Sequence, residues 1–478
     1  MHCRTDAFYI VLLVSLIAHL PVNGATGKVR DVEVGETNLN AVTWQSAAAD
    51  PQWHVHFKPS NMTAHMDTNV EIQVEITNIN AANLNDIMFR FHSENSDLAQ
   101  VNDIVRGLQF DPITQKWQGN ITIQVIFLGF TRIHVHMINE RENITEISKE
   151  SFPLIIIRKQ RVIDHVFTGS VALLVSLLYI NFGAALDVTV LKGLIVKPVG
   201  PSIGFFSQFV LMPLISYAVG YFVFSESVEM QLGLFFTGVS PSGGASNIWS
   251  VILGGNINLS VLMTTVSNIA AFGMMPLWIF TLGHLIFERG NMAIPYKNIA
   301  TFAIALIVPL AIGLAIQKCS QRLTRILVRF LKPISTCLIL FIIIFAIVTN
   351  LYMFKLFSWK IILAGLLLPW LGYMFAWILA KILRQNPADA LTIAIETGIQ
   401  NTGISIFLLR SLPQPQADLT TVIPVAVAIM TPFPLMALYL YNKCTGNNIK
   451  DGNYLTSENI SEYRHQQQHE QLQQPHQQ

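Results

Sequence analysis

The chain has 478 residues, of which 52% are hydrophobic and 12% are charged, with a formal net charge of +1. Soluble domains carry about 25% charged residues, so roughly half of the usual solubilising charge is missing. A near-neutral chain without a basic stripe argues against nucleic acid as a partner. From about Val166 to Tyr441, apolar runs of about 20 residues follow one another, which predicts repeated passage through a lipid bilayer.

Residues 1–24 have the pattern of a secretory signal peptide. Arg4 supplies a positive charge, Phe8 to Leu20 forms a short apolar core, and the small residues Gly24 and Ala25 suit a cleavage site. The apolar core is too short for a comfortable membrane span. We therefore expect a cleaved signal, with an uncleaved anchor as the alternative.

Residues 25–160 predict an extracellular β-domain. Apolar and polar residues alternate in several runs separated by Asn-rich turns, as in half-buried strands. The pattern favours a small β-sandwich, with an immunoglobulin-like arrangement as one form of it. The alternating apolar positions are Val70, Ile72, Val74 and Ile76, then Ile121, Ile123 and Val125, then Ile133, Val135 and Met137.

Three glycosylation sequons in this domain agree with a lumenal or extracellular location. They begin at Asn61, Asn120 and Asn143. The domain contains no cysteine, so it is expected to fold without an internal disulfide. A basic segment, Arg158 to Arg161, closes the domain and is interpreted as a solvated cluster beside the membrane, with a protease site as the alternative.

Residues 161–442 predict a transmembrane transporter domain of about nine helices. The expected spans are 164–186, 200–222, 229–253, 258–286, 297–317, 331–352, 358–382, 388–410 and 418–441. Lys and Arg are more frequent in the loops that this count places in the cytoplasm, which puts the N-terminus outside and the C-terminus inside. Residues 443–478 are polar and of low complexity, which predicts a disordered cytoplasmic tail.

Two of the predicted spans are interrupted. The third contains Pro and paired Gly between residues 238 and 247, and the eighth contains Glu396 and two Gly up to residue 403. Pro and Gly free helix hydrogen-bonding groups, which then need protein or water as partners. A carboxylate at membrane depth costs several kcal/mol and usually marks an ion or substrate path.

The interrupted spans occupy corresponding places in two groups of four, roughly 164–286 and 331–441. The odd number of spans before the second group inverts its orientation relative to the first. Paired interrupted helices in two halves indicate a transporter binding site. The sequence therefore predicts an α-helical polytopic membrane protein with inverted repeats and two discontinuous crossing helices, behind a β-sandwich-like domain.

Oxygen-bearing side chains gather in and around the interrupted spans, namely Glu396, Gln400, Ser246, Asn247 and Thr264. Carboxylate, amide and hydroxyl oxygens are ligands for a hard cation. Sodium is the natural candidate, and a proton on Glu396 is the alternative. A structural role for Glu396, hydrogen-bonded to Asn247 or Gln400, is a further reading of the same residues.

Five motifs in chain order resemble the sodium/bile acid symporter family, and the resemblance covers about residues 164–441. They are Gln208 to Pro213, Gly243 to Asn247, Asn258 to Thr265, Gly273 to Pro276 and Glu396 to Thr402. The long N-terminal domain resembles an orphan branch of the family. One departure is Gly403, which stands where bile acid carriers have Gln. It leaves the sodium motif intact and puts the substrate in doubt.

The resemblance implies two sodium sites and a substrate site at the crossing of the broken helices. The first sodium site would use Ser246, Asn247, Ser260, Thr264 and Glu396, and the second Gln208, Glu396, Gln400 and the carbonyl near Ile399. Asn247 and Asn401 are the candidates for substrate binding. No cofactor is expected beyond sodium as the coupling ion.

The expected function is sodium-coupled symport of an amphipathic organic anion, such as a bile acid or sulfated steroid, at the plasma membrane. The alternative is a receptor-like or scaffold protein that acts through its ectodomain without transport. A channel suits two broken helices around a carboxylate less well. An enzyme is not expected, because no nucleophilic triad, metal cluster or phosphate loop is present in the sequence.

Overall fold

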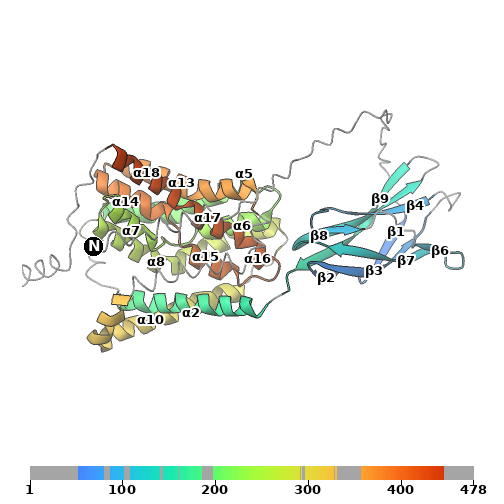
Figure 1. Cartoon of the computed structure of the whole chain (residues 1–478), viewed down its shortest axis with the longest axis horizontal. Helices are drawn as coiled ribbons and strands as arrows, with labels where there is room; N and C mark the ends of the chain where they lie inside the picture. The colour runs from blue at the N-terminus through green and yellow to red at the C-terminus, as the bar shows by residue number, and fades with distance from the viewer. Residues whose placement is uncertain are drawn as a thin grey trace, which may run out of the picture.

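The structure is a computed structural model that describes residues 52–79, 87–101, 108–139, 144–159, 161–185, 198–290, 292, 296–327, 329–330 and 357–445. The predicted signal peptide, the sixth span at 331–352, Asn143 and nearly all of the tail lie outside the described residues. The chain forms a β-sheet part followed by a helical part, which lie end to end (Figure 1).

The N-terminal part is a sandwich of two sheets. One sheet has the order β1-β3-β7-β5, with β6 also paired to β7, and the other has the order β2-β9-β8-β4. All pairings are antiparallel except that of β2 with β9. The strands are β1 His54–Lys58, β2 Met62–His65, β3 Thr68–Thr77, β4 Ile87–Ser93, β5 Ala99–Val101, β6 Gln109–Asp111, β7 Lys116–Val125, β8 Gly129–Asn139 and β9 Ile144–Ile157.

The predicted alternation places its apolar positions in the space between the sheets. Ile72, Ile121 and Ile133 are all at most 2% exposed and belong to one continuous apolar core. Val70 and Met137 pack against this core from its margin. The strands and the sandwich expected from the alternation are therefore confirmed. The first two sequon asparagines, Asn61 and Asn120, have exposed side chains.

The helical part contains the expected spans in the expected order, as far as it is described. Its helices are α2 Val162–Ala185, α4 Val199–Phe206, π-helix η2 Ser207–Leu211, α5 Met212–Val223, α6 Val228–Gly238, α7 Ala245–Ile252, α8 Ile257–Phe280, α9 Leu282–Arg289, α10 Tyr296–Cys319, α13 Trp359–Ile382, α14 Pro387–Gly398, α15 Thr402–Leu409, α16 Gln416–Thr420, α17 Val422–Met430 and α18 Pro432–Cys444. Helix α2 packs along α10 (Figure 1).

Four helical stretches within the described residues are long and apolar enough to cross a membrane by length and composition. They are Val199–Val223, Ile257–Phe280, Trp359–Ile382 and Gln416–Cys444. The third and eighth spans are each divided into two shorter helices, which agrees with the predicted interruptions. The total of nine spans stays a prediction. The last helix continues to Cys444, two residues beyond the boundary expected at 442.

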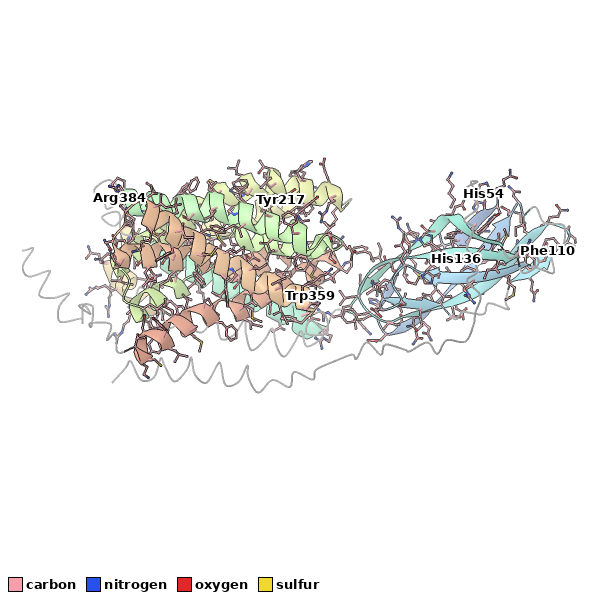
Figure 2. All side chains as sticks on the ribbon, turned by 90° about the horizontal axis from the view of Figure 1, so that it is seen from above. His54, Phe110, His136, Tyr217, Trp359 and Arg384 are labelled. Atoms are coloured by element: carbon pink, nitrogen blue, oxygen red, sulfur yellow. The ribbon has the colours of Figure 1, made fainter. Side chains whose placement is uncertain are left out.

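Helix α13 shows how the helical part is oriented relative to the sandwich. Its first residue, Trp359, lies toward the β-sheet part, while Arg384, just after its last turn, lies at the opposite end (Figure 2). Arg384 follows the expected span 358–382, where the count of spans places a cytoplasmic loop, and the sandwich was expected outside. The two expectations are consistent with each other, because they place Arg384 and the sandwich on opposite sides of a membrane, and the two lie at opposite ends of the helical part.

The junction between the two parts contains a buried chain of ion pairs. Arg158 Nη1 lies 2.7 Å from Asp164 Oδ2 in the first turn of α2, and Arg158 Nε lies 3.6 Å from Asp418 Oδ2 in α16. Arg410 Nη1 lies 2.7 Å from the other oxygen of Asp418. Arg158 is only 8% exposed. The interpretation of this basic segment as solvated is therefore wrong for Arg158, because acidic residues of the helical part bury its guanidinium.

Candidate functional site

Two interrupted helices cross in the helical part and share hydrogen bonds where they unwind. Between α6 and α7, the backbone N–H of Gly243 donates to the carbonyl of Ile399 at 2.8 Å. In return, the N–H of Asn401, between α14 and α15, donates to the carbonyl of Pro241 at 2.8 Å. The pairing around Ser242 and Gln400 is antiparallel. Backbone groups that the helix breaks set free thus satisfy one another without water.

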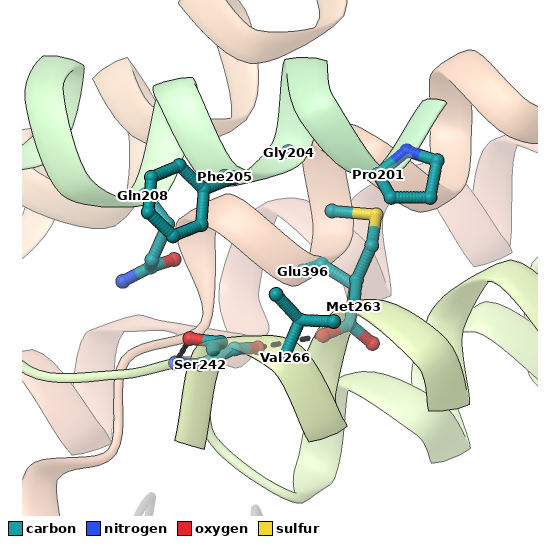
Figure 3. A pocket seen from close by; sticks show the side chains of 9 residues that line it. Pro201, Gly204, Phe205, Gln208, Ser242, Met263, Val266 and Glu396 are labelled. Atoms are coloured by element: carbon teal, nitrogen blue, oxygen red, sulfur yellow. Dashed lines mark hydrogen bonds between the residues drawn. The ribbon is translucent and has the colours of Figure 1, made fainter. Parts of the chain in front are cut away.

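Glu396 lies in the last turn of α14 and is 1% exposed. The hydroxyls of Ser242 and Thr264 donate to its Oε2 at 2.7 and 2.8 Å, and the hydroxyl of Ser260 donates to its Oε1. Ser260 and Thr264 are four residues apart on α8, so they lie on the same helix face. Figure 3 shows the bond from Ser242 to the carboxylate.

Asn247 and Ser246, at the start of α7, complete this cluster. Asn247 Oδ1 lies 2.9 Å from the Ser260 hydroxyl, and Asn247 Nδ2 donates to Thr264 Oγ1 at 3.3 Å. The Ser246 hydroxyl is 3.4 Å from that of Ser242. The five residues expected for the first sodium site are therefore brought together around one carboxylate.

The residues expected for the second site lie beside the first. Gln208, in the π-helix η2, donates through Nε2 to the carbonyl of Ser240 at 2.7 Å and to Gln400 Oε1 at 2.8 Å. Gln400 Nε2 donates to the carbonyl of Thr397 at 2.6 Å. No group among the described residues donates to the buried Oε1 of Gln208. This oxygen is therefore available as a ligand.

Two of the expected residues have additional structural contacts. The carbonyl of Ile399 accepts from Gly243, which leaves it one further lone pair. Asn401 Oδ1 accepts from the N–H of Ile404 at 3.2 Å, so its side chain caps the first turn of α15. Asn247 and Asn401 are both half-buried.

A pocket connects the two groups of ligands, because Glu396 and Gln208 both line it (Figure 3). Apolar side chains from α4 and α8 complete its wall. The lining residues are Pro201, Gly204, Phe205, Gln208, Ser242, Met263, Val266, Ser267 and Glu396.

Two contributors were not expected from the sequence. Ser242 donates to Glu396, and its own backbone N–H donates to the hydroxyl of Ser267 at 2.9 Å. Ser242 lies in the middle of the Pro- and Gly-rich interruption, and this position could have identified it as a residue of the site. Ser267 lies on α8, three residues beyond Thr264, and only its helix phase pointed to the site.

The site can bind a hard cation. None of the ion pairs among the described residues includes Glu396. A buried carboxylate with no cationic side chain beside it is a favourable place for a cation or a proton to bind. Hydroxyl, amide and carboxylate oxygens surround it, and such oxygens are the ligands of hard cations.

Several known proteins are similar to this chain in sequence. A family model for the Sodium Bile acid symporter family matches residues 172–357. P3 protein of Homo sapiens is 30% identical over 272 residues, which are 56% of this chain and 57% of P3 protein. The alignment thus spans little more than half of that relative.

Two relatives have names that state a transport activity. Ileal sodium/bile acid cotransporter of Oryctolagus cuniculus is 31% identical over 298 residues, which are 60% of this chain and 84% of the cotransporter. Sodium-dependent organic anion transporter of Bos taurus is 31% identical over 250 residues, which are 52% of this chain and 65% of that protein. Because one alignment at 31% identity extends over most of a cotransporter, the chain is a multi-pass membrane protein that belongs to the sodium/bile acid symporter family.

Proposed function

We propose that this protein is a sodium-coupled symporter of an amphipathic organic anion. The observation that carries the proposal is Glu396, a buried carboxylate held by three hydroxyls at the crossing of two broken helices. The names of two relatives, a sodium/bile acid cotransporter and a sodium-dependent organic anion transporter, support the same class of activity. Bile acids and sulfated steroids are the substrates to test first.

Two sodium sites are proposed. Ser246, Asn247, Ser260, Thr264 and Glu396 would hold the first ion. The free Oε1 of Gln208, the side chain of Gln400, the second lone pair of the Ile399 carbonyl and Glu396 would hold the second. Asn247 and Asn401, at the starts of α7 and α15, are proposed to contact the substrate. Each sodium ion that moves inward gains about 2.3 kcal/mol per 100 mV of membrane potential, which is the driving force for accumulation.

We also propose a plasma-membrane location, with the sandwich outside and the tail in the cytoplasm. The opposite positions of Trp359 and Arg384 along the long axis support this orientation (Figure 2). The two exposed sequon asparagines, Asn61 and Asn120, support a glycosylated sandwich.

The test is uptake of labelled bile acids and sulfated steroids by cells expressing the wild type, Glu396→Gln or Glu288→Gln. Glu288 is the matched control, because its carboxylate is exposed at the end of α9. Each variant is measured with sodium and with choline in its place, after surface protein is quantified. We expect Glu396→Gln to lose sodium-dependent uptake at least tenfold, because a neutral amide no longer attracts the ion.

Binding of radioactive sodium to the purified protein decides the case in which none of the tested anions is a substrate. Saturable binding that disappears in Glu396→Gln supports the symporter proposal even when no substrate has been found. Uptake that follows a pH gradient and ignores sodium would replace sodium by a proton. If sodium neither binds nor drives uptake, the symporter proposal is wrong.

A receptor-like or scaffold function is the second candidate. The observation in its favour is that the sandwich has a hydrophobic core of its own, separate from those of the helical part. A folded extracellular domain of this size suits recognition of a partner. Deleting the sandwich distinguishes the two candidates, because a symporter without it retains sodium binding, whereas a receptor loses its ligand.

A further inference from the structure

A proline next to the proposed second sodium site leaves a backbone carbonyl without its helical donor. In an α-helix, the carbonyl of Phe209 would accept the N–H of residue 213, but this residue is Pro213, which has no N–H. The proline ring also crowds that carbonyl. Just before it, residues Ser207–Leu211 form a π-helix, in which the N–H of Met212 reaches back to the carbonyl of Ser207.

Trp278 supplies the missing donor from another helix. Its indole Nε1 on α8 donates to the carbonyl of Phe209 at 2.6 Å. Phe209 is fully buried, so bulk water does not reach this part of the chain. A buried carbonyl that loses its partner is left with the full cost of its desolvation. The indole N–H therefore stabilises the π-helical form of this segment.

The π-helix sets the position of Gln208, the residue that directly precedes Phe209. Gln208 crosses to the broken helices and donates to the carbonyl of Ser240 and to Gln400. Helix α8 carries Trp278 as well as two of the hydroxyls around Glu396. One helix thus contributes ligands to the first proposed site and fixes the backbone that presents Gln208 at the second.

We propose that Trp278 is a positioning residue for the cation site formed by Gln208 and Gln400, acting through the carbonyl of Phe209. Trp278 touches neither the ion nor the substrate in this assignment. Its indole N–H holds the π-helix in the shape that aims the free Oε1 of Gln208 at the site. The assignment rests on the proposed sodium-coupled function for its effect on transport, and on the structure alone for its effect on the backbone.

The test uses the full-length protein with Trp278→Phe, which removes the N–H and keeps an aromatic ring. The matched control is Trp370→Phe on the exposed face of α13, where the indole is 44% exposed. We expect Trp278→Phe to weaken sodium binding about fivefold, as for the loss of one buried hydrogen bond. The maximal uptake rate per surface molecule is expected to stay near that of the wild type. Trp370→Phe should change neither quantity.

A double-mutant cycle with Pro213→Ala separates this role from general packing. Alanine restores an N–H that can donate to Phe209, so Trp278→Phe should weaken sodium binding less in this background than in the wild type. Equal losses in the two backgrounds would overturn the proposal. If Trp278→Phe alone folds poorly, Pro213→Ala should restore its folding, and a failure to do so would overturn the proposal.

Amide hydrogen exchange of residues 207–212 provides a measurement that does not depend on sodium. We expect faster exchange in Trp278→Phe than in the wild type or in Trp370→Phe, because the π-helix has lost the hydrogen bond from the Trp278 indole. Unchanged exchange refutes the positioning role even if transport falls. If the wild type binds no sodium but exchange rises in the variant, the proposed function fails and the positioning of the segment stands.

Discussion

The hydroxyls around Glu396 can act on the carboxylate and on a cation at the same time. A hydroxyl has one hydrogen to donate and two lone pairs, so Thr264 can donate to Glu396 and still offer an oxygen to an ion. The same donors reduce the cost of keeping the carboxylate charged in an apolar surrounding. We therefore expect the charged state of Glu396 to depend on these hydroxyls, and the binding of a cation to depend on both.

Thr264→Val tests this dependence, because valine keeps the shape of the side chain and removes only the hydroxyl function. We expect the sodium concentration for half-maximal binding to rise about tenfold, since hydrogen bonds to charged groups contribute about 1.5–3 kcal/mol. Thr265→Val is the control. Its hydroxyl donates to the carbonyl of Val261 in its own helix, and its removal should leave sodium binding unchanged. Similar losses in both variants would contradict the assignment of Thr264.

The residues of this site differ in how far the sequence could predict them. Glu396 is a lone carboxylate in an apolar run, and Ser260 and Thr264 share a face of a continuous helix, so periodicity applies to them. Ser242 lies in an unwound segment, where no periodicity tells which way a side chain points. Its contact with Glu396 depends on the crossing of a second helix 154 residues away in the chain.

At the scale of secondary-structure elements, the crossing depends on how closely two unwound segments approach. A Cβ atom on Gly243 would lie 2.8 Å from the carbonyl oxygen of Gln400, which is too close for a backbone neighbour. The next residue, Gly244, has open space at the same position. Only the first of the two glycines is therefore required by the crossing.

Gly243→Ala should separate the two broken helices, whereas Gly244→Ala should be tolerated. We expect Gly243→Ala to lower the free energy of unfolding by about 2 kcal/mol, the usual cost of overpacking. Thermal unfolding of the purified proteins measures the difference. If the two variants unfold at the same temperature, the close backbone approach does not contribute to stability.

Elements with a regular repeat were predictable, and their cross-contacts were not. Alternation along Ile72 and Val74 predicted a strand, and Pro and Gly near residue 241 predicted a broken helix. The parallel pairing of β2 with β9 joins segments about 90 residues apart, with nothing local to indicate it. The contact of Trp278 with Phe209 was equally out of reach, because a tryptophan near the end of a span is also typical of a membrane-interface belt.

At the scale of the whole molecule, Arg158 connects the sandwich to two different places in the helical part. It pairs with Asp164 on α2 and with Asp418 on α16. Asp418 is 1% exposed and also accepts from Arg410. The relative position of the sandwich, α2 and α16 is thus fixed by charges that are largely removed from water.

Asp418→Asn should destabilise this junction, because two guanidinium groups lose their shared carboxylate in a buried position. We expect a loss of about 3 kcal/mol in the free energy of unfolding, as when one partner of a buried ion pair is removed. Adding Arg158→Gln to this variant should cost less than Arg158→Gln costs in the wild type. Strictly additive losses in thermal unfolding would show that the two side chains are not coupled.

Only four residues separate the end of β9 at Ile157 from the start of α2 at Val162. A connection this short, with its first arginine buried, leaves the sandwich little freedom to rotate relative to the helical part. The two parts are therefore expected to move together. A force that tilts the sandwich would therefore also act on the first turn of α2 and, through Asp418, on α16, which packs against α6.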